Sequence, residues 1–418
     1  MDKALLEEVP GREEDDQRRR RCRFVEELKK VSYMAGPMVA VSVSQYLLQV
    51  ISLMMVGHIG QLSLSGVAIA TSFTNVTGFS LLFGLAGALE TLGGQAYGAE
   101  RYQKLGTYTY CSILSLLTIC IPLSLPWIFM EKLLTLMGQD PQIAQVASIY
   151  SIWLIPALFA DAILQSFVRC SAICGKTRTL ILKDIYISIK EFLGFALPSA
   201  VMVCLEWWSF EFLVLLSGLL PNSELETSVL SICLSTTSLH YFIPYGFGAA
   251  ASTRVSNELG AGNPQAARVA VNVVIVLGVM DAMIVSIAFF GCRHVFGYIY
   301  SNEKEVVDYV GEMIPLISLS VIVDSLLAVL SGVARGTGWQ HIGAYVNLGA
   351  YYLVGIPVAA LLCFGLHLRG KGLWIGILTG SSLQLLLLAL VTFFTNWQKQ
   401  ASKAQERMIE EKFPNGLA

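Results

Sequence analysis

Long apolar stretches alternate with short polar connections along most of the chain. Ten of them are long enough to cross a lipid bilayer, which takes about 20 mostly apolar residues. They cover roughly residues 33–56, 66–96, 107–130, 143–168, 192–220, 228–250, 268–291, 310–334, 342–366 and 372–395. Lipid offers no hydrogen bonds to backbone groups, so such segments must be helices or strands of a closed barrel. Continuous apolar runs such as residues 383–391 lack the two-residue alternation of a barrel strand. The pattern predicts an all-α polytopic membrane protein.

The charged residues agree with this prediction. They make up only 14% of the chain, against about 25% in an ordinary soluble domain. They also crowd into the two ends, where we expect polar tails over residues 1–32 and 398–418. Too few remain elsewhere to form a water-soluble surface, and a net charge of −2 offers no footprint for nucleic acid. This excludes a soluble globular protein and a nucleic-acid binder, and it makes the lipid bilayer the main partner.

The lysines and arginines of the connections predict the orientation in the membrane. With a cytoplasmic N-terminus, only five of the 28 fall on the outer side, namely Lys132, Arg293, Lys304, Arg369 and Lys371. Cytoplasmic loops carry the excess of positive charge in membrane proteins, so we expect both termini in the cytoplasm. The pattern is equally compatible with the plasma membrane and with an internal membrane such as that of the vacuole.

The two halves of the chain resemble each other. Gly84 and Gly98 recur as Gly246 and Gly260 at an offset of 162, and residues 164–169 (LQSFVR) resemble residues 330–335 (LSGVAR). Duplicated lobes around a central cavity are a common plan of secondary transporters. The alternative is the generic enrichment of small residues at helix contacts.

The second copy is longer than the first. After Arg335 the chain continues through two more apolar stretches to Trp397, whereas after Arg169 a short charged stretch leads directly to the next helix. We therefore expect a first lobe of four helices over residues 33–168. A cytoplasmic linker over 169–191 and a second lobe of six helices over 192–397 would follow.

Three strings carry a family resemblance: VGHIGQLSLSGVAIATSFTNVTGFSLLFGLAGALETLGGQAYGA, FALPSAVMVCLEWWSFEFLVLLSGLLPN and AAASTRVSNELGAGNPQAAR. They resemble the plant branch of the MATE (multidrug and toxic compound extrusion) family, and the likeness covers nearly all of residues 31–410. The resemblance implies twelve helices in two lobes and cation-coupled antiport of organic solutes. This chain departs from that pattern by lacking what would be the fifth and sixth helices.

Carboxylates deep in membrane spans mark transport or coupling sites. Glu206 and Asp324 lie near the middle of their helices, with no Lys or Arg at comparable depth. Removal from water favours the neutral form of a carboxyl group, so such residues can take up and release a proton. Both also match acidic positions of the family's second lobe. We expect Glu206 and Asp324 to couple protons and bind solute; a packing role for a protonated Glu206 is the alternative.

Other polar residues are weaker candidates. Glu211 follows Glu206 by five residues, which turns it about 140° around the helix. We therefore expect that the two do not face one cavity together and that Glu211 is a polar packing or folding contact. Asp281 lies at mid-depth without an aromatic neighbour, and Glu90 and Asp161 lie nearer the cytoplasmic helix ends. Among these, Asp281 and Glu90 are candidates for the cavity wall; a water-facing position is equally open for Glu90.

Aromatic and amide side chains could complete the cavity through hydrogen bonds and cation–π contacts. The candidates are Trp207, Tyr241, Tyr245, Asn347, Tyr351 and Gln45. Gln45 occupies the repeat position of Glu206 but cannot exchange a proton. Position 53, where some prokaryotic members of the family carry an aspartate, is Leu53, so coupling is expected in the second lobe alone.

No enzyme motif, metal-ligand cluster or nucleotide-binding loop occurs in the sequence, so we expect neither catalysis nor a cofactor. An ion gradient must then supply the energy. Carboxylates suit a proton gradient better than a sodium gradient, which needs several oxygen ligands at one point. The short first lobe leaves a rival interpretation open: a non-transporting family member, or one that functions only as a homo-oligomer.

Overall fold

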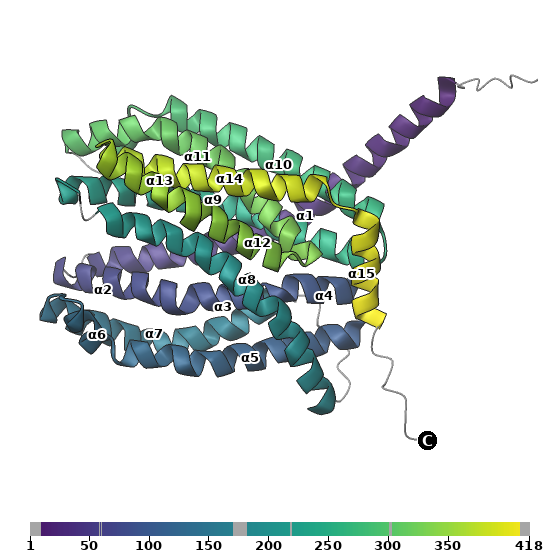
Figure 1. Cartoon of the computed structure of the whole chain (residues 1–418), viewed down its shortest axis with the longest axis horizontal. Coiled ribbons are helices and arrows are strands. Elements are labelled where there is room, and N and C mark those ends of the chain that lie inside the picture. Colours follow the sequence, from purple (N-terminus) through teal and green to yellow (C-terminus); the bar gives the residue numbers. More distant parts are fainter. Residues whose placement is uncertain are drawn as a thin grey trace, which may run out of the picture.

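The computed structural model describes residues 10–57, 59, 61–169, 182–217, 220–300 and 303–409. These residues are almost entirely helical and contain no strand. The helices lie side by side in one elongated bundle, and α15 (Trp397–Ile409) lies across one end of it (Figure 1). The described chain begins and ends there, so we call it the terminal end and the opposite one the far end.

The first repeat runs through seven helices and one π-helical turn. They are α1 (Pro10–Gly57), α2 (Gln61–Thr74), η1 (Asn75–Phe79), α3 (Ser80–Ala86), α4 (Ala88–Gly98), α5 (Tyr102–Ile128), α6 (Met130–Leu136) and α7 (Pro141–Val168). The elements from α2 to α4 follow one another closely and form one membrane span over Ser65–Gly98.

The second repeat is longer. Its elements are α8 (Leu182–Ser217), α9 (Ser223–Gly260), α10 (Pro264–Gly291), η2 (Phe296–Ile299), α11 (Lys304–Thr337), α12 (Gln340–Asn347), η3 (Leu348–Gly355), α13 (Ile356–Ala360), η4 (Leu361–Gly365) and α14 (Arg369–Phe393). The run from α12 to η4 again acts as one span, over Gln340–Gly365. Its π-helical turns, like η1, are of a kind found frequently at functional sites.

Nine helices of the described chain are long and apolar enough to cross a membrane, compared with the ten stretches expected from the sequence. The tenth stretch corresponds to α9, which is 38 residues long but more polar than the others. Its Thr236, Thr237 and His240 are all buried inside the bundle. α9 therefore has the length of a membrane span, and these three polar side chains lie inside the protein.

The two repeats exchange their first helices. Helix α1 packs along α9, and α8 packs along α3. Glycines of the repeated motif make these contacts possible, because a Cβ atom on Gly84 would come within 2.6 Å of Ala200 and one on Gly246 within 2.8 Å of the Val39 backbone. Matching contacts at matching positions show that the sequence repeat is a structural repeat.

A second pair of motif glycines brings α4 and α9 together at the terminal end. A Cβ atom on Gly98 would lie 1.8 Å from the Asn257 carbonyl oxygen, and one on Gly260 would lie 2.1 Å from that of Gln95. Neither position can accept a side chain without separating the helices. The repeats therefore meet backbone to backbone at this crossing.

The expected linker over 169–191 ends earlier in the structure. Residues 182–191 form the beginning of α8, and the Tyr108 hydroxyl donates a hydrogen bond to Glu191 Oε2 at 2.6 Å. The polar side chains of this stretch favour helix rather than interrupt it, because Lys and Glu are good helix formers. Residues 170–181 of the expected linker, and 1–9 and 410–418 of the expected tails, lie outside the described residues.

The amphipathic helix α15 connects the two repeats at the terminal end. It buries Ala401, Ala404 and Met408 against the bundle. Arg407 Nη1 donates a hydrogen bond to Gln95 Oε1 of α4 at 3.0 Å, and Lys104 Nζ donates to the Arg407 carbonyl at 3.2 Å. A helix that follows the second repeat is thus attached to the first.

Candidate functional site

A cavity of about 450 Å³ lies between the two repeats. Its wall comes from α1, η1, α3, α7, α8, α9, α11 and η3. The lining residues are Gln45, Tyr46, Leu48, Gln49, Asn75, Phe79, Phe83, Asp161, Leu164, Gln165, Glu206, Trp207, Phe210, Glu211, Leu234, Thr237, Ser238, Tyr241, Phe242, Asp324, Leu327 and Tyr351. The two carboxylates expected to act together, Glu206 and Asp324, both line this single cavity.

Glu206 is held by uncharged hydrogen-bond donors. Its Oε2 accepts from Gln384 Nε2 at 3.2 Å and from Asn347 Nδ2 at 3.4 Å, and its Oε1 accepts from the Tyr241 hydroxyl at 3.5 Å. The residue is buried, with 8% of its surface exposed. No Lys or Arg forms an ion pair with Glu206 among the described residues.

Asp324 reaches the cavity from α11. It makes no hydrogen bond or ion pair to the residues that the structure describes, and its charge interacts with that of Glu206. Its neighbour Ser325 turns away from the cavity and bonds to Asp281. A bare carboxylate therefore faces the cavity beside a hydrogen-bonded one.

The cavity wall is acidic and aromatic. Four carboxylates line it, those of Asp161, Glu206, Glu211 and Asp324, and no Lys, Arg or His is among the lining residues. Eight of the lining residues carry aromatic rings: Tyr46, Phe79, Phe83, Trp207, Phe210, Tyr241, Phe242 and Tyr351. Negative charge together with aromatic faces favours positively charged organic molecules.

The expectation that Glu206 and Glu211 do not face one cavity together is wrong. Both line the cavity, although they point from different sides of α8. Glu211 accepts a hydrogen bond from the Ser72 hydroxyl of α2 at 2.9 Å, whereas the partners of Glu206 come from the second repeat. The cavity extends around α8 far enough to reach both faces, which the angle between two residues on a helix does not reveal.

Four of the eight weaker candidates line the cavity: Gln45, Trp207, Tyr241 and Tyr351. The other four, Tyr245, Asn347, Asp281 and Glu90, lie away from the wall. The Tyr245 ring packs against the Phe83 ring, with centroids 5.5 Å apart. Asn347 is fully buried behind the wall and donates to the Met202 carbonyl at 2.7 Å.

Asp281 faces the interior of the second repeat instead of the cavity. Its Oδ2 lies 3.0 Å from His240 Nε2 and accepts a hydrogen bond from the Ser325 hydroxyl at 2.9 Å. These partners come from α9 and α11, between which α10 packs. Asp281 therefore takes part in a polar contact among three helices of the second repeat, outside the cavity wall.

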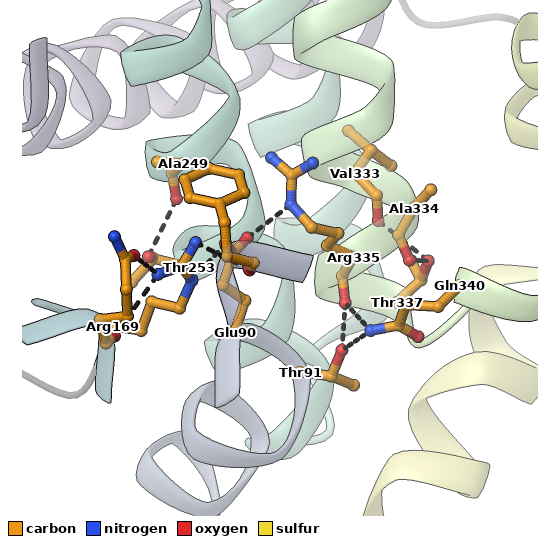
Figure 2. Close-up of polar contacts among 12 residues, drawn as sticks. Glu90, Thr91, Arg169, Ala249, Thr253, Val333, Ala334, Arg335, Thr337 and Gln340 are labelled. Atoms are coloured by element: carbon orange, nitrogen blue, oxygen red, sulfur yellow. Dashed lines mark hydrogen bonds and ion pairs between the residues drawn. The ribbon is translucent and has the colours of Figure 1, made fainter. Parts of the chain in front are cut away.

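Glu90 lies in a buried ion cluster at the terminal side of the cavity. Its Oε2 is 2.8 Å from Arg335 Nε, and its Oε1 is 3.3 Å from Arg169 Nε (Figure 2). All three side chains are about nine-tenths buried or more. Arg169 also donates to the Phe83 carbonyl at 3.3 Å and to the Gln165 side chain. Because Phe83 and Gln165 both line the cavity, the cluster lies directly beside it.

Neutral hydrogen bonds surround the cluster. The Thr91 hydroxyl donates to the Arg335 carbonyl, and Gln340 Nε2 donates to Thr91 Oγ1 at 2.6 Å (Figure 2). These contacts join α4 of the first repeat to α11 and α12 of the second. Together with the glycine crossing, they close the terminal end of the bundle.

Several of these residues were not predicted as site residues. Gln384 has no feature in the sequence that relates it to Glu206, 178 positions away. Arg169 and Arg335 were recognised only as markers of the repeat, although an arginine at the end of an apolar string in both copies is a usable signal. Asp161, expected towards a helix end, also lines the cavity, where its Oδ1 accepts from Gln165 Nε2 at 2.9 Å.

Comparison with known proteins gives consistent matches. The MatE family model matches residues 37–182 and again residues 198–361. Protein DETOXIFICATION 8 of Arabidopsis thaliana is 56% identical over 445 residues, covering 92% of this chain and 92% of that protein. Protein DETOXIFICATION 7 of the same plant is 52% identical, covering 92% and 89%.

A solved structure is similarly close. The crystal structure of the eukaryotic MATE transporter AtDTX14 superimposes with a TM-score of 0.88 at 52% identity, covering 93% of this chain and 100% of that one. An outward-facing multidrug resistance MATE family transporter shares the fold at 15% identity, with a TM-score of 0.75 over 91% of this chain and 97% of that one.

The alignment with Protein DETOXIFICATION 8 also shows how many residues this chain lacks relative to that protein. It spans 445 positions but takes in 92% of a 418-residue chain, so roughly 60 positions have no residue here. Two membrane spans of about 20 residues with their connections have this length. The missing length agrees with the absence of two helices from the first repeat.

Proposed function

This chain belongs to the MATE family of integral, multi-pass membrane efflux transporters, and we propose that it exports or sequesters an organic cation or amphiphile in exchange for protons. The observation that carries the proposal is the shared cavity of Glu206 and Asp324, whose lining residues include no positive charge. Family membership gives transport, and the cavity suggests the coupling ion and the class of solute.

The hydrogen bonding of Glu206 supports proton coupling. The amides of Gln384 and Asn347 and the hydroxyl of Tyr241 can satisfy an ionised carboxylate, but none of them carries a charge that would hold it ionised. A carboxyl group in such surroundings changes its protonation state when water or a cation enters. Asp324, with no partner among the described residues, has even less to fix its charge.

In the proposed cycle, the ionised Glu206 and Asp324 attract the positive centre of a solute, and nearby rings such as Trp207 contact its apolar parts. Protons arriving from the outer or lumenal side neutralise both carboxylates and remove that attraction. The solute then leaves, and the repeats rock to the opposite access state. A ligand shifts such an equilibrium only as far as it binds the two states differently, and the carboxylates supply this difference.

The proposed orientation places both termini in the cytoplasm. It rests on the lysines and arginines, of which the far-end connections hold Lys132, Arg293, Lys304, Arg369 and Lys371. The terminal end carries the excess of positive charge, as cytoplasmic faces do. Protease protection of tags at the two termini, in sealed vesicles of known orientation, tests this arrangement.

Purified protein in proteoliposomes with an imposed pH gradient tests the coupling, with ethidium as the fluorescent organic cation. We expect Glu206→Gln to reduce gradient-driven ethidium transport to the level of empty vesicles, because the amide cannot exchange a proton. Glu211→Gln is the matched control: it changes the same residue type on the same helix and in the same cavity. We expect it to keep the rate within about twofold, since a glutamine can still accept from Ser72. Undiminished transport by Glu206→Gln would refute the assignment.

The roughly 60 missing positions favour a second candidate: a family member that transports only as a homo-oligomer, or not at all. The first repeat then lacks two helices of its outer wall, which a second copy or lipid must cover. Proteoliposomes holding at most one chain each separate the candidates. Full ethidium transport by single chains contradicts the second candidate. Transport that appears only after a two-helix segment is inserted behind Arg169 supports it.

A further inference from the structure

Two arginines at equivalent positions of the two repeats share one carboxylate. Arg169 ends the string LQSFVR, and Arg335 ends the matching string LSGVAR. Both guanidinium groups reach Glu90 of α4, whereas the repeat position of Glu90 in the second half is Ser252. The cluster therefore contains two positive charges and one negative charge, and each arginine binds its own oxygen of Glu90, Oε1 for Arg169 and Oε2 for Arg335.

The two ion pairs differ in what they connect. Arg169 lies at the end of α7, so its pair with Glu90 stays within the first repeat. Arg335 lies on α11, so its pair with Glu90 joins the repeats. Figure 2 shows Arg169 and Arg335 approaching Glu90 from opposite sides. When the repeats separate at the terminal end, only the pair with Arg335 breaks.

The two arginines also differ in how well their hydrogen-bond donors are satisfied. Arg169 is anchored in its own repeat, because it donates to the Phe83 carbonyl and stacks on the Phe83 ring at 4.5 Å. Arg335 is less well satisfied: its Nη2 is buried without a hydrogen-bond partner among the described residues. The contacts of Arg169 are thus satisfied in the closed arrangement. Arg335 gains hydrogen bonds when the terminal end opens and water reaches it.

We propose that Glu90 is the charged latch of the terminal end, with Arg335 as the arginine that closes it and Arg169 as the resident counter-ion that lets it open. A buried carboxylate left without a counter-charge is strongly destabilising. Arg169 removes this penalty from the open state because it stays beside Glu90 after Arg335 departs. It also weakens the closed state, because it takes part of the charge of Glu90 away from Arg335.

Opposite effects of two chemically identical substitutions follow. Arg335→Gln removes the bond between the repeats and shifts the population towards the open terminal end. Arg169→Gln leaves Glu90 dependent on Arg335 alone and shifts the population towards the closed one. A purely structural role would give both variants the same kind of defect, a loss of stability without opposite displacements.

Distances between spin labels in the full-length protein in lipid vesicles measure this population. The labels are attached through a keto amino acid at positions 103 and 265, so that the native cysteines remain. Gln103 and Gln265 are exposed, repeat-related residues at the terminal ends of the two repeats. We expect Arg335→Gln to raise the ratio of long to short distances about tenfold and Arg169→Gln to lower it by a similar factor.

Lys371→Gln is the control for removing a positive charge, because Lys371 pairs with Glu312 on the exposed far end. We expect it to change the ratio by less than about twofold. Glu90→Gln removes the latch itself and should resemble Arg335→Gln. Displacement of both arginine variants in the same direction overturns the proposal, as does an Arg169→Gln variant indistinguishable from Lys371→Gln. The measurement uses no transport step, so its outcome is separate from that of proton coupling.

Discussion

Glu90 and Glu206 are equally buried, each with 8% of its surface exposed, but the molecule surrounds them in opposite ways. Glu90 meets two guanidinium groups, which keep it ionised. Glu206 meets two amides and a hydroxyl, which accommodate a charged or a neutral carboxyl group. Burial alone therefore does not assign a role to a membrane carboxylate. The charge of its partners separates an ion-paired carboxylate from a candidate proton site.

The largest expected effect comes from removing each carboxylate. Glu90→Leu leaves Arg169 and Arg335 buried without a counter-charge, so we expect the free energy of unfolding to fall by about 3–5 kcal/mol. Glu206→Gln keeps the shape of the side chain and a neutral group among neutral partners, so its cost should stay below about 1 kcal/mol. Unfolding of the purified protein by denaturant in mild detergent measures both values. Equal costs would remove the distinction between the two carboxylates.

His240 and Asp281 provide an intermediate case, because this hydrogen-bonded pair lies inside one repeat and outside the cavity wall. His240→Leu removes one of the two partners of Asp281 and leaves the Ser325 hydroxyl in place. We expect a loss of about 1–3 kcal/mol in the free energy of unfolding. The number of protons moved per ethidium, measured in proteoliposomes with a pH-sensitive dye, should not change. A changed number of protons per ethidium would show that Asp281 takes part in proton coupling, as proposed for Glu206.

The smallest expected effect concerns the partners of Glu206. Gln384→Leu removes an N–H donor that favours the ionised carboxylate. We expect the ionised form to become harder to reach, so the profile of transport against pH should move upward by about one pH unit or less. Gln45→Leu is the matched control, because Gln45 lines the same cavity from α1 and has no hydrogen bond to Glu206 among the described residues. A downward displacement in Gln384→Leu, or equal displacements in both variants, would contradict this explanation.

Much of the fold could be predicted from the sequence because the bilayer imposes a length and polarity on every span. The apolar stretches, the duplication of Gly84 and Gly98, and the missing pair of helices all follow from patterns local to the chain. The least apolar span, α9, shows where this reasoning weakens. Its Thr236 and His240 side chains are buried and have partners in the protein, and the sequence does not state which side of a helix faces lipid.

The candidate site was harder to predict because its partners are distant in the chain. The depth of Glu206 and Asp324 could be estimated from their positions within apolar runs, and both reach the cavity. The pairing of Glu90 with Arg335 joins residues 245 positions apart, and no local pattern predicts it. The error about Glu211 has a related cause: a helical wheel gives the angle between two side chains but not the extent of the space around the helix.

The exchange of first helices between the repeats has a consequence for biosynthesis. Helix α1 leaves the ribosome long before its packing partner α9 exists, so it must enter the bilayer on its own apolar character. Helix α9 is too polar for that criterion, but it is made after α1 and α4, two of the four helices against which it packs most closely. When α9 is inserted, α1 and α4 are therefore already present to pack against it. The helices of the first repeat, in turn, remain exposed to lipid until the second repeat is made and packs against them.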